Sequence, residues 1–356
     1  MKKIGVLAAG GTGGHIIPAI AIGNELKKLG VEIIFIGNKN GMEKKLAGDF
    51  NFKGIDVQKL YRKLTYKHLF FPYKFIKSIY NSYKIISKFK PDFFLGTGGF
   101  VSGPVGLAAK LYKLPIFIQE QNSYPGITNK FLGKYAEFIF LAYNNAKPYF
   151  PDNKIIFSGN PVNPTVFDTS EIDYSDYGLK KESFKIFLLG GSQGSRFLNK
   201  NLYPIIDKLL EEKIEIIWQT GRLDIERYKN LTKEGLYIFD FTKEMGKIYN
   251  SVNLVIGRAG AITLEEIKTK KIPSILVPLS IAAGNHQYFN ALENFNKGFC
   301  EIIKEKDMSP DKLYHTIKKI ISNYDKYKSA LDKVKVQNSA KVIAEKIYDK
   351  IYKEEK

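Results

Sequence analysis

Short apolar runs alternate with amphipathic segments along the whole chain. In the first half, predominantly apolar runs occupy residues 3–8, 31–36, 92–95, 115–118, 137–142 and 154–157. In the second half, they occupy residues 184–189, 215–218, 236–239, 254–256 and 274–277. Runs of this length are typical of strands buried on both faces of a parallel sheet, and the longer segments between them have helical periodicity. The pattern predicts an α/β fold assembled from βαβ units.

Each half begins with a strand that runs into a glycine-rich turn, at residues 10–14 and 190–195. We therefore predict two doubly wound, Rossmann-like domains with parallel sheets, residues 1–162 and 163–337. The linker is expected near residues 159–164, where two prolines and a glycine interrupt any helix or strand.

Three local features complete this prediction. Pro18 suits the first turn of the helix that follows the first glycine turn. Residues 168–181 are expected to form a polar surface connection. Residues 338–356 form a last helix with an apolar face, which can pack on either domain and which we place on the first.

Composition and charge limit the class of protein. The 356-residue chain is 44% hydrophobic and carries a formal net charge of +19. Only five of its basic residues are arginine, which argues against sequence-specific DNA binding, so no nucleic-acid partner is expected. The excess of lysine then reflects either a general compositional bias or contact with an anionic membrane. The single cysteine, Cys300, excludes an intramolecular disulfide framework and a cysteine-rich zinc site.

No segment has the pattern of a membrane anchor. The apolar run 4–9 ends at two glycines and is too short for the core of a signal peptide. No run approaches the roughly 18 apolar residues of a transmembrane helix. We expect a cytoplasmic protein whose contact with a membrane is peripheral.

Three glycine-rich turns, at residues 10–14, 96–99 and 190–195, each follow a predicted strand. Ligands of open α/β sheets bind at the carboxyl ends of strands. A glycine turn before a helix directs backbone N–H groups and the helix dipole at an anion, usually a phosphate. None of the three matches the dinucleotide-binding motif or the P-loop, which disfavours a dehydrogenase or a P-loop ATPase. One such turn is equally well explained as a tight connection, but three of them favour phosphate binding.

Polar side chains beside these turns are candidates for chemistry. His15 follows the first turn at a helix start, where the dipole favours a neutral imidazole that can accept a proton, although it could simply pack. Glu120 and Asn122 end another strand of the first half. They could orient a catalytic base or bind a sugar hydroxyl, or they could simply be part of a polar loop. In the second half, residues 258–266 and 285–287 form two more helix starts with groups suited to anions and hydroxyls.

In order along nearly the whole chain, these segments resemble the N-acetylglucosaminyltransferases that make lipid II in peptidoglycan synthesis. These enzymes are two-domain nucleotide-sugar transferases of the GT-B class. The matching segments are GGTGGH (10–15), GGFVSGP (98–104), EQN (120–122), GITNK (126–130), GNPV (159–162), GGSQG (190–194), 258–266 and NHQ (285–287). The resemblance implies two domains facing a central cleft, and inverting transfer of N-acetylglucosamine from UDP-N-acetylglucosamine to the muramyl C4 hydroxyl of lipid I. It also implies a place on the cytoplasmic face of the cell membrane.

The resemblance implies that the second domain holds the donor. Glu266 would bind the ribose, Phe241 and Thr242 would lie at the uracil, and Gln287 with His286 would read the sugar. The residues assigned to the donor are Ser192, Gln193, Phe241, Thr242, Arg258, Ala261, Ile262, Thr263, Glu266, His286 and Gln287. Loop amides and Arg258 would stabilise the departing UDP, so no metal or other cofactor is expected. Asn163 departs from the family pattern, which often has an arginine there.

The resemblance also implies that the first domain holds lipid I. Its pyrophosphate would lie against Thr12, Gly13, Gly14, Gly98, Gly99 and Ser102. His15 is the expected base, with Glu120 and Asn122 as further catalytic residues. Because the acceptor is a lipid, an aromatic and lysine-rich segment at residues 61–90 is expected to contact the anionic membrane, unless it is an ordinary amphipathic helix. The expected membrane contacts are Leu69, Phe70, Phe71, Phe75, Ile76 and Ile79.

Two other functions are compatible with these features. A GT-B enzyme that glycosylates diacylglycerol or another membrane lipid would share the glycine turns and the basic aromatic segment. A non-catalytic lipid- or nucleic-acid-binding protein could retain the same fold. The presence of His15, Glu266 and Gln287 argues against the second alternative.

Overall fold

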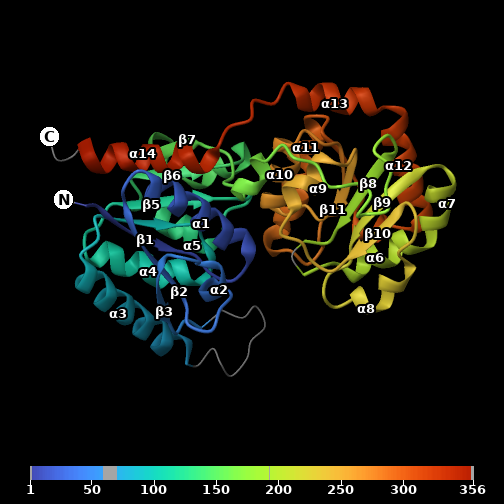
Figure 1. The fold of residues 1–356 in the computed structure, drawn as a ribbon. Helices are drawn as coiled ribbons and strands as arrows, with labels where there is room; N and C mark the ends of the chain where they lie inside the picture. Colours follow the sequence, from blue (N-terminus) through green and yellow to red (C-terminus); the bar gives the residue numbers. More distant parts are fainter. Residues whose placement is uncertain (1, 59–69, 192, 354–356) are drawn as a thin grey trace. The chain divides into compact units, whose positions relative to one another are not determined.

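The computed structural model of the protein describes residues 2–58, 70–191 and 193–353 (Figure 1). The chain divides into two compact units. The first unit comprises Met1–Asn163 together with Asn338–Lys356, and the second comprises Pro164–Gln337. Each unit contains one sheet with parallel neighbouring strands, which confirms the predicted α/β architecture.

The first unit is built on a 7-stranded sheet in the order β3-β2-β1-β4-β5-β6-β7. Its strands are β1 (Ile4–Ala8), β2 (Glu32–Asn38), β3 (Asn51–Ile55), β4 (Phe93–Gly96), β5 (Ile116–Glu120), β6 (Phe138–Leu141) and β7 (Ile155–Phe157). Val6 of β1 lies between Ile34 of β2 and Phe94 of β4. The strand order therefore reverses direction between β1 and β4, which is where ligands of doubly wound folds bind.

Helices cover both faces of this sheet (Figure 1). They are α1 (Gly13–Lys28), α2 (Glu43–Leu46), α3 (Phe71–Phe89), α4 (Gly99–Leu111), α5 (Ile127–Gly133) and α14 (Ser339–Lys353), with the 3-10 helices η2 (Asn144–Tyr149) and η3 (Asp152–Lys154). On one face, Ile22 of α1 and Ile347 of α14 join Leu7 in a buried core. On the other face, α3, α4 and α5 enclose a second core around Val6. Both faces of β1 are thus buried, as its uninterrupted apolar sequence requires.

The second unit repeats this design with a 6-stranded sheet in the order β10-β9-β8-β11-β12-β13. Its strands are β8 (Phe184–Leu189), β9 (Ile214–Gln219), β10 (Leu236–Phe239), β11 (Leu254–Gly257), β12 (Ser274–Leu276) and β13 (Cys300–Ile302). The order reverses between β8 and β11, where Ile186 pairs with Leu254.

The helices of the second unit also lie against both faces of its sheet. They are α6 (Arg196–Leu202), α7 (Ile206–Glu211), α8 (Ile225–Tyr228), α9 (Met245–Asn250), α10 (Ala261–Thr269), α11 (His286–Asn296), α12 (Pro310–Ser322) and α13 (Tyr324–Asp332). The 3-10 helices are η4 (Pro164–Phe167), η5 (Tyr203–Ile205), η6 (Lys229–Leu231), η7 (Ala283–Asn285) and η8 (Glu305–Asp307). One core is centred on Trp218 and Ile256, and the other on Phe187 and Tyr249.

Two local predictions were wrong. Pro18 lies inside α1 rather than in its first turn, because the helix already begins at Gly13. Residues 168–181 are more than a polar surface connection, since Ile172 and Leu179 enter the core around Tyr249. Among the described residues, no helix has both the length and the apolar composition needed to cross a bilayer.

Candidate active site

The carboxyl ends of β1, β4 and β5 bring the polar motifs of the first unit together; we call this region the first edge. His15 lies in the first turn of α1, and its ring is partly buried. Its Nδ1 is 2.8 Å from Oε1 of Gln121 and 3.1 Å from the carbonyl oxygen of Thr97. Both neighbours accept hydrogen bonds, so Nδ1 carries a proton, and in the neutral ring the lone pair is on Nε2. A neutral imidazole held in this way can act as a base through Nε2.

The first two glycine turns contact each other at this edge. Gly99 has φ +81°, and a Cβ atom there would lie 1.9 Å from the carbonyl oxygen of Gly10. Only glycine therefore allows the turn after β4 to reach the turn after β1. Thr12 is the N-cap of α1 without a side-chain cap bond, and Gly98 is the N-cap of α4. Two helix N-termini thus start from touching turns, an arrangement suited to an anion.

Ser102 does not have the position expected of an acceptor-binding residue. It is completely buried, and its hydroxyl is 2.7 Å from the carbonyl oxygens of both Ala8 and Gly98. The hydroxyl hydrogen is therefore used within the protein, where it ties β1 to the second glycine turn. The helix begins at Gly99 and turns this side chain inward, so the acceptor-binding role of Ser102 stays a prediction without support from its position.

Glu120 also faces inward. Its carboxylate accepts bonds from the backbone N–H groups of Asn122 (2.9 Å) and Gly126 (3.1 Å) and from the side-chain amides of Asn122 (3.2 Å) and Asn129 (2.9 Å). The residue is only 1% exposed. Its predicted catalytic role is not supported, because four donors occupy its oxygens and give it the task of shaping the loop after β5. Asn122 is partly buried at the start of that loop.

The corresponding region of the second unit, at the carboxyl ends of β8, β11 and β12, is the second edge. Here Arg258 forms an ion pair with Glu305 at 2.7 Å. It also donates to the carbonyl oxygen of Val277 (3.1 Å) and to Oγ of Ser195 (3.0 Å), the N-cap of α6. The backbone N–H of Ser280 binds the other oxygen of Glu305 at 2.9 Å. Arg258 therefore connects the loops of this edge, and its charge is already paired.

Burial and pairing have opposite effects on this ion pair. Burial lowers the pKa of Arg258, and the negative charge of Glu305 counteracts this. Burial acts to raise the pKa of Glu305, but the hydrogen bonds from Ser280 and the charge of Arg258 outweigh it, so that the pKa is lowered. Both groups are therefore ionised at neutral pH.

The helix α10 begins at this edge with Gly260 as its N-cap. The side chains of Ala261 and Ile262 are buried, and Thr263 is partly exposed. The polar groups of this turn are therefore mainly the backbone N–H groups of a helix start. One turn further, Oε2 of Glu266 accepts a hydrogen bond from the hydroxyl of the buried Tyr249 at 3.0 Å.

Burial strongly affects the titration of this glutamate. It raises the pKa of Glu266 to about 7, and the hydrogen bond from Tyr249 acts in the opposite direction. The pKa of Tyr249 is raised well above its ordinary value by burial and by the charge of Glu266. Glu266 is therefore a partly exposed residue with a buried carboxyl group, whose pKa lies near neutral pH.

The remaining donor residues lie in loops of the second unit. Oε1 of Gln287 accepts from the backbone N–H of Leu279 at 3.0 Å, which leaves its amide nitrogen to donate. His286 begins α11 after Asn285, whose φ is +53° and whose side chain does not cap the helix. Phe241 is 44% exposed, and the guanidinium carbon of Arg222 lies 5.8 Å from its ring centre.

Three further positions complete the predicted donor set. Thr242 uses its hydroxyl oxygen to accept from the backbone N–H of Glu244 at 2.9 Å. Gln193 is exposed, and Ser192 lies outside the described residues. In the described ranges, no three His, Cys, Asp or Glu side chains gather in a way that could hold a metal ion.

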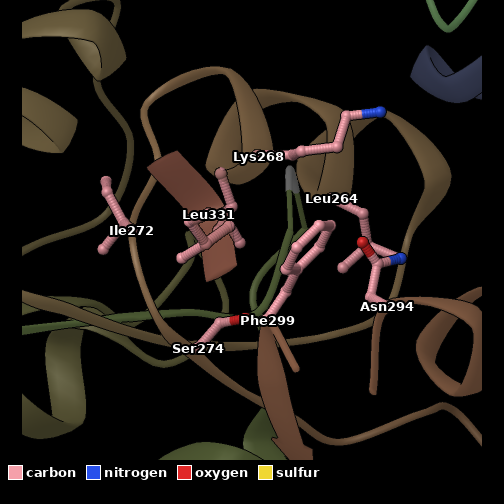
Figure 2. A pocket seen from close by; sticks show the side chains of 8 residues that line it. Leu264, Lys268, Ile272, Ser274, Asn294, Phe299 and Leu331 are labelled. Carbon is pink, nitrogen blue, oxygen red and sulfur yellow. The ribbon is translucent and has the colours of Figure 1, made fainter. Parts of the chain in front are cut away.

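A small cavity in the second unit is not part of this edge (Figure 2). It is lined by Leu264, Ile267, Lys268, Ile272, Ser274, Asn294, Phe299 and Leu331. Ser274 begins β12 and Ile272 precedes it, so the cavity lies at the amino end of that strand. The glycine turns lie at the opposite, carboxyl ends, and we therefore assign the cavity no part in the site.

Sequence reasoning missed three residues that hold the candidate groups in place: Gln121 beside His15, Glu305 beside Arg258, and Tyr249 beside Glu266. The signal for Gln121 was available, because four polar residues at 119–122 follow an apolar strand. For Glu305 and Tyr249 the sequence offered no signal, since their partners are distant in the chain.

The outer face of α3 carries aromatic and basic side chains. We define this face as Tyr73, Ile76, Lys77, Tyr80, Tyr83 and Lys84. Tyr73 and Ile76 are each 66% exposed, and Tyr80 is 56% exposed. The ammonium groups of Lys77 and Lys84 lie 5.8 Å and 4.5 Å from the ring centres of Tyr73 and Tyr80.

The predicted membrane contacts divide between this face and the interior. Phe70 is exposed, whereas Phe71 and Phe75 stack on each other and are partly buried. Ile79 is partly buried and packs on the core around Val6, on the inward side of the helix, so its membrane contact stays a prediction without support from its position. Leu69 lies outside the described residues.

Comparison with known proteins identifies the family. Residues 6–141 match the glycosyltransferase family 28 N-terminal domain, and residues 185–347 match the family 28 C-terminal domain. A Flavobacterium psychrophilum protein is 40% identical over 86% of this chain and 86% of its own length. A Bacillus subtilis protein is 32% identical over 92% of this chain and 93% of its own. Both are named UDP-N-acetylglucosamine--N-acetylmuramyl-(pentapeptide) pyrophosphoryl-undecaprenol N-acetylglucosamine transferase. The chain belongs to this family, the MurG family.

The fold agrees with this assignment. The crystal structure of MurG from Acinetobacter baumannii superimposes with a TM-score of 0.78, covers 98% of this chain and 99% of its own, and is 28% identical. The match to both family 28 domains confirms the predicted GT-B glycosyltransferase fold, and the chain is a glycosyltransferase. The first edge lies within the N-terminal match, and the second edge within the C-terminal match.

Proposed function

We propose that this MurG-family chain transfers N-acetylglucosamine from UDP-N-acetylglucosamine to lipid I and so forms lipid II. The names of its relatives give the donor sugar and the pyrophosphoryl-undecaprenol acceptor. The observation in this chain that supports the proposal best is His15, whose Nδ1 is bonded while its Nε2 has no partner among the described residues. A base in this state suits the removal of a proton from a sugar hydroxyl.

In the proposed reaction, His15 Nε2 takes the proton of the muramyl C4 hydroxyl as that oxygen attacks the anomeric carbon of the donor. The new C–O bond forms on the face opposite UDP, the bond from the anomeric carbon to the UDP oxygen breaks, and the anomeric configuration inverts. The transition state has oxocarbenium character, as in glycoside chemistry generally. UDP leaves with the electron pair, and His15 holds the proton.

The touching glycine turns of the first edge support an acceptor site in the first unit. The backbone N–H groups at the starts of α1 and α4 suit the pyrophosphate of lipid I, whereas that of Gly11 already donates to Glu43 at 3.0 Å. In the second unit, α10 would receive the donor pyrophosphate, Glu266 the ribose, Phe241 the uracil and Gln287 the sugar. Because Glu305 neutralises Arg258, the amides at the start of α10 would provide most of the stabilisation of UDP.

We further propose that the enzyme works at the cytoplasmic face of the cell membrane, with the outer face of α3 in the headgroup region. Tyrosines suit the boundary between water and lipid, and lysines add about 1 kcal/mol each against anionic lipid. Substitution of Tyr73, Ile76 and Tyr80 by serine should greatly reduce co-sedimentation with vesicles of phosphatidylglycerol while UDP binding stays unchanged. Tyr203→Ser with Leu223→Ser, at exposed positions of the second unit, is the matched control. Undiminished co-sedimentation of the triple variant would contradict this placement.

The reaction itself is tested with a soluble, short-chain lipid I analogue and three donors: UDP-N-acetylglucosamine, UDP-glucose and UDP-galactose. Each is assayed with and without EDTA. Transfer from the N-acetylglucosamine donor alone, unaffected by EDTA, is the expected result. No transfer from any donor by folded protein, alongside a working positive control, would overturn the proposal.

A further inference from the structure

Three buried amide side chains lie in series beneath His15 at the first edge: Gln121, Gln119 and Asn160, which we call the amide chain. Gln119 is 0% exposed, and Gln121 and Asn160 are each 1% exposed. They come from three places in the sequence: the end of β5, the residue that follows it, and the segment after β7. Buried amides of this kind need partners for each donor and acceptor, so their bonds show which way each group points.

The surroundings of Gln121 determine the orientation of its amide. Its Nε2 lies 2.8 Å from the carbonyl oxygen of Thr97 and 3.2 Å from that of Gln119, and it also donates to Oε1 of Gln119. All three neighbours are oxygens that only accept. A reversed amide would place its own oxygen against them, so Nε2 must face this group and Oε1 must face His15.

The rest of the amide chain fixes Gln119 in turn. Nε2 of Gln119 donates to Oδ1 of Asn160 at 3.1 Å. Nδ2 of Asn160 donates to the backbone carbonyl oxygen of Gln121 at 3.0 Å, so the hydrogen bonds return to the residue from which they started. Each bond in the series has a single direction, and the last acceptor in it is Oε1 of Gln121, 2.8 Å from Nδ1 of His15.

We propose that Gln121 is the positioning residue that fixes His15 as its Nδ1–H tautomer, with the lone pair of Nε2 directed away from the protein interior. The catalytic part of this inference rests on the proposed role of His15 as the base. Gln121 is a neutral acceptor, unlike the carboxylate that often orients a catalytic histidine. An amide holds the ring without adding another carboxyl group beside the first glycine turn, where the buried Glu43 already accepts from the backbone N–H of Gly11 at 3.0 Å.

The tautomer is tested directly on the wild-type, full-length protein. Nitrogen-15 NMR of the histidine side chains, with His15 identified by comparison with His15→Ala, reports which ring nitrogen carries the proton. At a pH where the ring is neutral, we expect a protonated Nδ1 and an unprotonated Nε2. A His15 ring protonated at Nε2 would overturn the proposal. This measurement depends neither on catalysis nor on a variant of Gln121.

The link to catalysis is tested with Gln121→Met, which keeps the length of the side chain but removes the amide. We expect kcat to fall about tenfold, which corresponds to the loss of one hydrogen bond, with KM for the donor unchanged. Gln337→Met, at an exposed position outside both edges, is the matched control. An unchanged kcat in Gln121→Met would count against the inference.

A double-mutant cycle separates positioning from a merely structural effect. Gln121→Met in the His15→Ala background should cause no further loss of kcat, because Gln121 acts through His15. The same tenfold loss in both backgrounds would overturn the proposal. If His15→Ala itself were as active as the wild type, the proposed function of His15 would fail, while the NMR result would still decide the tautomer.

Discussion

The two edges use the same fold but opposite kinds of polar contact. At the first edge, neutral amides and backbone carbonyls surround His15, and the carboxyl groups of Glu43 and Glu120 accept hydrogen bonds from the loops. At the second edge, the main contacts are the ion pair between Arg258 and Glu305 and the bond between Tyr249 and Glu266. Both edges follow a reversal of strand order, so the difference lies in the loops and not in the sheets.

This difference agrees with the roles proposed for the two edges. If His15 is the proposed base, Gln121 and Thr97 fix the geometry of its ring through neutral oxygen atoms. A site for a nucleotide diphosphate needs loops held firmly in place, and a paired arginine crosslinks them without an excess of charge. The contacts of the first edge therefore orient one histidine ring, and those of the second edge hold several loops together.

The largest expected effect is at the first edge. His15→Ala should lower kcat by about a thousandfold, since a general base contributes about that much. The affinity of the His15→Ala variant for UDP, measured by calorimetry, should not change, because His15 lies in the first unit and UDP is proposed to bind the second. His315→Ala, at an exposed position on α12, is the control for loss of a histidine. Equal values of kcat in the two variants would contradict the proposed role of His15 as the base.

Breaking the ion pair should have the next largest effect, this time on stability. Glu305→Ala leaves Arg258 without its partner at a site where both side chains are largely buried, and should lower the free energy of unfolding by about 3 kcal/mol. Glu226→Ala removes the partner of Lys229 in an exposed pair and should cost less than about 1 kcal/mol. Denaturant titration of the two variants measures the contrast. Similar costs would mean that the second edge does not depend on its buried charges.

The pH dependence of donor binding should reflect a titrating group of the second edge. If Glu266 accepts hydrogen bonds from the ribose, it must be ionised, and its pKa is about 7. The affinity for UDP should therefore fall as the pH drops below about 7, approaching tenfold per pH unit. Tyr249→Phe removes the hydrogen bond that lowers this pKa, so the loss should begin at higher pH. Calorimetric titrations between pH 6 and 8 test this, and an affinity independent of pH would contradict it.

The smallest expected effect concerns Ser102, and it distinguishes a structural role from a role in acceptor binding. Ser102→Ala removes a buried hydroxyl that bonds only within the protein, and should cost about 1 kcal/mol of stability. KM for the lipid I analogue should stay within about twofold of the wild type. A large rise in KM with little loss of stability would restore Ser102 to the acceptor site.

The sequence predicted the fold well where an element has a clear pattern. β8 and β10 have the predicted bounds, because each is a mainly apolar run with a glycine at one end and a polar residue at the other. β3 and β13 were not predicted. β3 interrupts its apolar residues with Lys53 and Gly54, and β13 has only three residues at the edge of its sheet. Such strands are formed by pairing with a neighbour, which the local sequence does not reveal.

The candidate site was predictable to a similar, partial extent. The glycine turns and His15 follow apolar strands, and the topology of a parallel sheet brings the turns to one edge. The orientation of Ser102, the saturation of Glu120 and the pairing of Arg258 were not predictable. Each depends on a partner supplied by another loop, and only the folded backbone determines whether such a partner is within bonding distance.

The position of α14 has a consequence for synthesis on the ribosome. This helix contributes Ala340, Ile343, Ala344, Ile347 and Ile351 to the core of the first unit, although the whole second unit is translated before it. Domains generally begin to fold in the order in which they are made. The first unit must therefore wait, with the apolar surface that receives α14 uncovered, until translation has passed through the second unit. A chain that stopped before residue 339 would keep that surface exposed, and quality-control proteases could recognise it as incomplete.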